Sequence, residues 1–133
     1  MVRLGLYAHR RFIAAHGVPV SLEEACRHAI GFDRDPEAQR ALDERQLSLT
    51  RDAFAFRSDS DLAQLAALRA GFGVGACQTG IACREPDLVP VLEGQFHYGM
   101  EVWVAMHEDL AASRRVHLLF DCLVEGLAEY VRS

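Results

Sequence analysis

Several features that define other protein classes are missing from this sequence. No apolar run approaches the roughly 20 residues that a membrane-spanning helix needs. The first five residues, Met-Val-Arg-Leu-Gly, do not place a positive segment before an apolar one, so the sequence carries no sign of a secretory signal peptide. We therefore expect a cytoplasmic protein with no membrane partner.

Lysine is absent: all 14 basic residues are arginine, and the formal net charge is −5. No basic stripe runs along the chain, and the longest positive features are the pairs Arg10-Arg11 and Arg114-Arg115. Proteins that bind a phosphate backbone carry clustered positive charge. The composition therefore argues against direct DNA binding by these residues.

Closely spaced metal ligands are also lacking. The six histidines include no H-x-x-x-H spacing and the four cysteines form no C-x-x-C pair. Structural zinc sites need such pairs, so we expect no metal and no cofactor. Small or apolar neighbours predict reduced core thiols at three positions, Cys26, Cys77 and Cys122.

Length and composition favour a single domain. The chain has 133 residues, of which 50% are apolar and 25% charged. A chain of this size buries roughly two-thirds of its unfolded surface. Strand-like segments alternate with helical ones, which predicts an α/β sheet.

The N-terminal segment begins with apolar residues at every second position, which predicts a strand over 3–8. A short helix over 10–16 is predicted to end at Gly17, because glycine tolerates left-handed geometry. Ser21-Leu22-Glu23-Glu24 is a capping box, which predicts a helix that ends near His28.

The next segment is less regular. A short buried strand is predicted over 29–32. From 33 to 52 the period is ambiguous, and we expect a surface excursion with one loose helical turn and a strand around 46–49. A further strand is predicted over 53–57.

A second capping box, Ser58-x-x-Asp61, predicts a helix over 59–70 that ends at Gly71. The helical period places four apolar side chains on its buried side, Leu62, Leu65, Ala66 and Leu68.

The remaining elements follow in the same alternation. A strand is predicted over 74–77, a helix over 78–83, and extended segments over 88–92 and 100–106. Ser113 is expected to cap a final helix over 114–131. Its apolar side chains recur at spacings of three and four and form one stripe, made of Val116, Phe120, Leu123, Leu127 and Tyr130.

Gly71-Phe72-Gly73-Val74-Gly75 has the wrong context for a nucleotide-binding loop. Such a loop needs a strand, then glycines, then a helix whose amides meet phosphate. Here the glycines follow a predicted helix and precede a strand. We therefore predict a tight turn with close backbone packing.

Polar residues follow two predicted strands: Ser58-Asp59-Ser60 after the first, and Gln78-Thr79 after the second. In open α/β sheets, ligands gather at the carboxyl ends of the strands, and the free amides at a helix start favour polar partners. A ligand-binding edge is one interpretation, and ordinary helix capping is the other. Asp59 would repel an anion unless its carboxylate turns away.

The ordered set of motifs resembles the effector-binding domain of LysR-type transcriptional regulators. The resemblance is carried by motifs that occur in the order of the family: Leu6-Tyr7-Ala8, Phe12-Ile13-Ala14-Ala15-His16-Gly17 with Pro19, Ser21-Leu22-Glu23-Glu24-Ala25, Arg57-Ser58-Asp59-Ser60, Ala70-Gly71-Phe72-Gly73-Val74-Gly75, Leu88-Val89-Pro90-Val91-Leu92, Val102-Trp103-Val104-Ala105-Met106-His107, and the segment from Arg115 to Leu127. It covers nearly the whole chain.

The resemblance implies an open, Rossmann-like mixed sheet flanked by helices, which forms one lobe of a type 2 periplasmic-binding-protein-like fold. The second lobe would span about 9–100, the crossing strands about 3–8 and 100–107, and the terminal helix about 114–131. The family's N-terminal helix-turn-helix, linker helix and most of its first lobe have no counterpart in this sequence, so DNA would be contacted only through that absent helix-turn-helix.

The resemblance further implies that a small-molecule inducer binds between two lobes. The residues that correspond to this lobe's cleft edge are Ser58, Asp59, Ser60, Gln78 and Thr79. His9 and Met106, near the ends of the crossing strands, would flank the hinge.

Two other functions remain open from the sequence. The chain is a small α/β enzyme if Cys77, at the carboxyl end of a predicted strand, is a nucleophile. It is a self-associating interaction domain if the stripe on the terminal helix needs a partner. That stripe predicts a homodimer or a larger homo-oligomer.

Overall fold

The computed structural model describes residues 1–44 and 49–132. Its centre is a mixed sheet in the order β3-β2-β4-β1-β5, with β6 also paired to β1. β2 is parallel to β3 and β4, whereas β1 is antiparallel to β4, β5 and β6. The strands are β1 (Val2–His9), β2 (Ala29–Gly31), β3 (Phe56–Arg57), β4 (Val74–Gln78), β5 (Leu88–Val91) and β6 (Tyr98–Met100).

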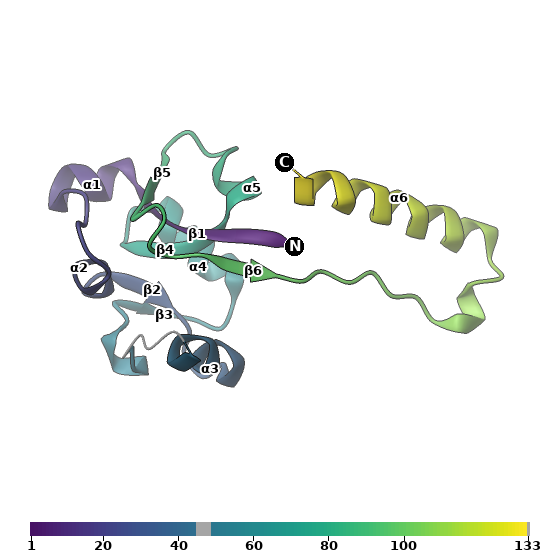
Figure 1. Ribbon diagram of the computed structural model, residues 1–133, viewed down its shortest axis with the longest axis horizontal. Coiled ribbons are helices and arrows are strands. Elements are labelled where there is room, and N and C mark those ends of the chain that lie inside the picture. Colours follow the sequence, from purple (N-terminus) through teal and green to yellow (C-terminus); the bar gives the residue numbers. More distant parts are fainter. Residues whose placement is uncertain (45–48, 133) are drawn as a thin grey trace.

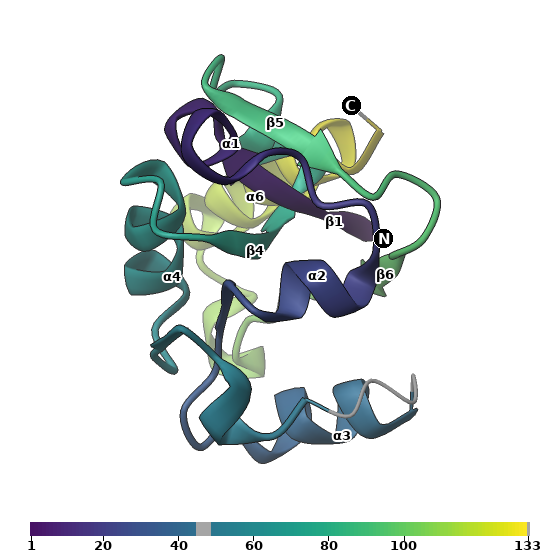
Figure 2. The same ribbon diagram turned by 90° about the vertical axis from the view of Figure 1, so that its left-hand side faces the viewer.

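Helices flank this sheet, and one helix lies apart from it (Figures 1 and 2). The α-helices are α1 (Arg10–His16), α2 (Leu22–Cys26), α3 (Pro36–Glu44), α4 (Asp61–Arg69), α5 (Thr79–Ala82) and α6 (Arg114–Arg132); the short 3₁₀ turns are η1 (Arg51–Ala53) and η2 (Glu108–Leu110). The predicted α/β class and the open mixed sheet are confirmed.

The core lies on both faces of the sheet because β1 alternates its side chains between them. Tyr7 belongs to a cluster with Ile30, Leu68 and Cys77. The next residue, Ala8, belongs to a second cluster, with Phe12, Ala25, Val74 and Val91. β1 is therefore the strand around which both halves of the core pack.

The first two helices end and begin as the sequence predicts. α1 ends at Gly17, whose φ of +83° favours glycine. Ser21 caps α2, since its Oγ accepts a hydrogen bond from the Glu24 amide at 3.2 Å. The Glu24 carboxylate accepts from the Val20 amide at 2.9 Å, one residue before the position that a capping box uses.

α4 starts two residues later than predicted. Ser60, not Ser58, is its N-cap, and its side chain accepts from the Ala63 amide. The predicted buried side is wrong at Leu62, which is 79% exposed, and at Ala66, which is exposed as well. The buried positions are Gln64, Ala67 and Leu68, because they are the ones that face the sheet.

The segment that follows β2 contains more helix than expected. A nine-residue helix, α3, replaces the single loose turn. Asp35 accepts hydrogen bonds from the amides of Glu37 and Ala38, and Pro36 occupies the first helical position, where its missing amide is harmless. The strand predicted around 46–49 falls largely on residues outside the described ones, and Leu49 has no regular structure.

The C-terminal quarter differs most from expectation. The strand predicted over 100–106 is wrong beyond its first residue: β6 ends at Met100, which pairs with Val2 of β1. Residues 101–107 leave the sheet in extended form and lead through η2 to α6, which lies apart from the body (Figure 1). α6 forms as predicted but buries no residue, so Cys122 is exposed and the prediction of a core thiol there is wrong.

Glycines between α4 and β4 permit a close approach of two backbones. Gly71 has a φ of +74°, and a Cβ on Gly73 would lie 2.1 Å from the carbonyl oxygen of His28. That same oxygen accepts a hydrogen bond from the Val74 amide at 2.9 Å. The predicted tight turn with close packing is confirmed.

We expect Gly73→Ala to lower the free energy of unfolding by about 1–3 kcal/mol, because the added methyl group must displace the His28 carbonyl and disturb the β2–β4 ladder. Urea unfolding followed by circular dichroism measures the change. Gly126→Ala is the matched control: nothing lies within 4 Å of a Cβ at this position in α6, so its stability should be unchanged or higher by up to about 1 kcal/mol. Equal stability of the Gly73 variant and the wild type would contradict this account.

Candidate functional site

Three parallel strands end at one edge of the sheet. Ile30 of β2 pairs with Phe56 of β3 and with Gly75 of β4. The three strands run in the same direction, so the residues that follow them lie at the same end of the sheet. Adjacent strands are about 4.8 Å apart, and the register puts Thr79 two residues further along than Ser58, which together place the two residues roughly 12 Å from each other. Both are half-buried. We call residues 32–35, 58–60 and 78–79 the carboxyl edge.

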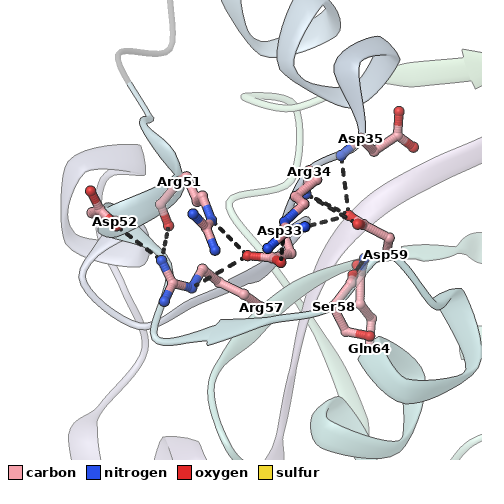
Figure 3. A network of polar contacts seen from close by, with 9 residues as sticks. All are labelled: Asp33, Arg34, Asp35, Arg51, Asp52, Arg57, Ser58, Asp59 and Gln64. Carbon is pink, nitrogen blue, oxygen red and sulfur yellow. Dashed lines mark hydrogen bonds and ion pairs between the residues drawn. The ribbon is translucent and has the colours of Figure 1, made fainter.

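Asp59 ties two loops of the carboxyl edge together. Its Oδ1 accepts hydrogen bonds from the amides of Asp33 at 2.8 Å, Arg34 at 2.9 Å and Asp35 at 3.2 Å, and Oδ2 accepts from Arg34 at 3.1 Å (Figure 3). The Arg34 amide, and after it the Asp33 amide, lower the pKa of Asp59 below its ordinary value. The carboxylate therefore turns into the loop after β2.

Asp33 is the centre of an ion-pair network beside this loop. Its carboxylate lies 2.7 Å from Arg51 Nε, 3.5 Å from Arg34 Nε and 3.9 Å from Arg57 Nε (Figure 3). Its hydrogen bond and charge raise the pKa of Arg51 above its ordinary value. The sequence did not predict this network because Arg51 and Arg57 are 18 and 24 residues from Asp33, on separate elements, and no local spacing marks them as its partners.

The two serines of the edge are held by backbone groups. Ser58 Oγ accepts from the Ser60 amide at 3.2 Å, and the Ser58 carbonyl accepts from Gln64 Nε2 at 2.7 Å. Ser60 Oγ accepts from the Ala63 amide at 3.4 Å. As acceptors, both hydroxyls keep their own hydrogen to donate to a bound molecule.

Gln78 and Thr79 lie at the end of β4 and the start of α5. Gln78 Oε1 accepts a hydrogen bond from the Tyr130 hydroxyl at 2.8 Å, which connects the edge to the last turn of α6. Burial raises the pKa of Tyr130, so this hydroxyl stays protonated as a donor. The carboxyl edge therefore combines hydroxyl and amide groups from three elements.

The structure does not bring His9 to the carboxyl edge. β1 is antiparallel to β4, and its register pairs Leu4 with Gln78 and Ala8 with Val74. His9 therefore lies at the opposite end of the sheet, where its Nδ1 accepts from the Arg11 amide at 3.0 Å and caps α1. Met106 lies in the extended segment 101–107, away from the sheet.

A cavity of about 290 Å³ lies at the part of the carboxyl edge formed by residues 32–35, on the side of α3. Pockets for small molecules are usually about 300–1,000 Å³, so this cavity lies just below that range. Neither Ser58 nor Thr79 lines it; the lining residues are Phe32, Asp33, Arg34, Asp35, Pro36, Gln39, Leu42, Arg51 and Phe54.

Cys77 is poorly placed to act as a nucleophile. It is buried, and its Sγ lies 3.6 Å from the Gln78 carbonyl oxygen, to which it donates. Burial raises the pKa of the thiol. Because the thiolate is the reactive form, this environment suppresses the chemistry that an enzyme would need.

In the described part of the chain, no three His, Cys, Asp or Glu residues are grouped so as to hold a metal ion. Within the same residues, no helix combines the length and apolarity needed to span a membrane.

Comparison with known proteins supports the class that the sheet and its edge define. Residues 1–128 match the family described as the LysR substrate binding domain. The regulatory domain of CrgA, a LysR-type transcriptional regulator from Neisseria meningitidis, is similar with 22% identity and a TM-score of 0.70 over 95% of this chain and 65% of that one. The AphB regulatory domain from Vibrio vulnificus is similar with 16% identity and a TM-score of 0.50 over 68% of this chain and 49% of that one.

A longer CrgA structure is similar with a TM-score of 0.69 and 23% identity, over 95% of this chain and 45% of that one. The chain thus spans about two-thirds of a regulatory domain and under half of a longer regulator. A search of curated protein sequences found no match.

The open mixed sheet with flanking helices is one lobe of a type 2 periplasmic-binding-protein-like fold. More specifically, the chain belongs to the LysR substrate binding domain family, whose role is effector sensing in LysR-type regulators.

The hydrogen bonds that the Asp59 carboxylate accepts from residues 33–35, which we call the Asp59 clamp, predict that the stability of the fold depends on pH in the acid range. Because its folded-state pKa lies below the unfolded value of about 3.9, the clamp stabilises the fold fully above about pH 4 and is lost as pH falls through the folded-state pKa. We expect Asp59→Asn to be less stable than the wild type at neutral pH, and the difference to shrink below about pH 4. Urea unfolding at a series of pH values measures it.

Asp121→Asn on exposed α6 is the matched control, for which we expect no such convergence. If the stability difference between Asp59→Asn and the wild type stayed constant down to about pH 2, the clamp would not depend on the ionised carboxylate.

Proposed function

We propose that this chain is the effector-sensing lobe of a LysR-type transcriptional regulator and that a small-molecule inducer binds at its carboxyl edge. The observation that supports the proposal is the position of this edge: in a chain of this family, hydroxyl and amide side chains from two loops lie at the end of the sheet where parallel strands end. Ligands of open α/β sheets bind outside the carboxyl ends of their strands.

In this proposal Ser58, Ser60 and Thr79 donate or accept hydrogen bonds with the inducer, and Gln78 contributes its amide. Asp59 is a positioning residue, since its carboxylate is occupied by the amides of the loop after β2. The opposite wall of the site would come from another lobe, because a pocket normally buries most of its ligand.

The proposed role is binding and not catalysis. The buried thiol of Cys77, with its raised pKa, supports this assignment. DNA contact in such a regulator would belong to a helix-turn-helix outside these residues, consistent with the net charge of −5. We place the protein in the cytoplasm, where a bacterial-type regulator meets its DNA.

Inducer binding can be tested with the chain labelled with ¹⁵N and a panel of small organic acids, amino acids and sugars. A ligand at the carboxyl edge should shift the amide signals of residues 58–60 and 78–79. We expect Ser58→Ala and Thr79→Val each to weaken that ligand's affinity about three- to tenfold, the effect of losing one neutral hydrogen bond.

Ser113→Ala, at an exposed position before α6, is the control and should bind as the wild type does. A ligand that binds saturably, shifts signals elsewhere and is insensitive to both edge substitutions would contradict the proposed site.

A further inference from the structure

Two histidine rings from separate elements lie against each other at one end of the sheet. His16 is in the last turn of α1, and His28 directly precedes β2. Their ring centroids are 4.9 Å apart, and the ring planes are tilted by 55°. The two residues are 12 positions apart in the chain, so the short spacings that mark metal ligands in a sequence do not reveal this pair.

Buried neighbours hold both histidines in place. The ring of Phe12, which is 4% exposed, is stacked on His16 with centroids 4.4 Å apart and meets the His28 ring edge-on at 5.2 Å. The His28 backbone is fixed as well, since its amide donates to the Ala25 carbonyl at 3.1 Å and its carbonyl accepts from the Val74 amide at 2.9 Å. The pair is therefore preorganised by the core, as a binding site requires.

A hydrogen bond of His16 decides which of its ring nitrogens is available. His16 Nδ1 lies 3.2 Å from the Phe12 carbonyl oxygen, which can only accept, so Nδ1 carries the hydrogen. In the neutral ring the lone pair is then on Nε2. Histidines that bind metals commonly donate their other ring nitrogen to a backbone carbonyl in this way. Among the described residues, neither ring nitrogen of His28 has a hydrogen-bond partner, so this ring also has a nitrogen available to a ligand.

The separation of the two rings is the one that a shared metal ion requires. An imidazole nitrogen lies about 2.0–2.1 Å from a bound zinc ion, which puts the ring centroid roughly 3.2 Å from the metal. For two such rings at octahedral or tetrahedral angles, the centroids are about 4.5–5.2 Å apart. The observed 4.9 Å lies within this range.

The surroundings of the pair indicate what kind of metal site it is. His16 is exposed and His28 is half-buried, so an ion can reach the rings from solution and water can complete its coordination. Within the described residues, no third His, Cys, Asp or Glu joins the pair to make a group of three. A closed structural zinc site, with four protein ligands, is therefore excluded for these residues. Neutral imidazoles suit Ni²⁺, Cu²⁺ and Zn²⁺.

We propose that His16 and His28 form a two-histidine site for a divalent transition-metal ion, with water as the remaining ligands. The site lies at the amino end of β2, whereas the carboxyl edge begins where β2 ends. An ion bound there would join the end of α1 to the start of β2, which lie at the same end of the molecule (Figures 1 and 2). The proposal is independent of inducer binding, and its failure would leave the proposed function unaffected.

Paramagnetic broadening by Cu²⁺ tests the site in the wild type. Cu²⁺ broadens the signals of nuclei close to it, so the histidine ring signals of the ¹⁵N-labelled chain identify the ligands. The titration is carried out at about pH 7.5, where ordinary imidazoles are neutral. We expect the rings of His16 and His28 to lose their signals together and before those of His107 and His117, although both of these are exposed.

Matched substitutions test whether both rings bind the same ion. His16→Asn keeps a donor near the Phe12 carbonyl and removes Nε2, and His28→Asn removes the second ring. We expect each to weaken Zn²⁺ affinity at least about tenfold, because losing a ligand should cost no less than losing the partner of a ligand. Competition with a chromophoric zinc indicator measures the affinity. His117→Asn, on exposed α6, is the control and should bind Zn²⁺ as the wild type does.

Circular dichroism checks that the three variants keep the fold. Cu²⁺ that broadens all the exposed histidines alike would overturn the proposal, and this readout needs no variant. Zinc affinity that is insensitive to both substitutions, or that depends on only one of the two rings, would overturn it too.

Discussion

The ladders of β1 are the interaction on which the rest of this structure depends. This one strand pairs with β4 on one side and with β5 and β6 on the other, and its alternating side chains enter both core clusters. Its antiparallel direction decides which loops share an edge. The ends of β3, β2 and β4 are brought together, while the end of β1 itself, at His9, is placed at the opposite end of the sheet.

The carboxyl edge is organised mainly by backbone groups. A free carboxylate at Asp59 would repel an anionic ligand. Here the carboxylate accepts hydrogen bonds from the amides of three consecutive residues, which direct it into the loop after β2. Ser58 and Ser60 likewise accept backbone hydrogen bonds and retain a hydroxyl hydrogen each. An edge built in this way is held rigid before a ligand arrives, which lowers the entropic cost of binding.

The body, made of residues 1–44 and 49–100, and the arm, residues 101–132, differ in how much of their apolar surface is covered. In the body, the sheet satisfies its backbone groups and covers its apolar side chains with α1, α2 and α4. In the arm, secondary structure forms without that cover, and α6 buries no residue. The hydrogen bond from the Tyr130 hydroxyl to Gln78 links the two parts. The Gln78 side chain is therefore in contact with the arm and is also part of the carboxyl edge.

The sequence by itself determined the elements whose signals are local: β1, α1 with its Gly17 end, the cap at Ser21, and the glycine turn before β4. It also predicted that residues 58–60 and 78–79 share an edge, since parallel strands end together. Only the tertiary structure decided where α4 begins, that Asp59 binds the loop after β2, and that His9 lies at the other end of the sheet. It also decided that residues 101–107 pair with no strand among the residues that the structure describes. These depend on strand direction and on contacts between residues far apart in the chain, which no local pattern encodes.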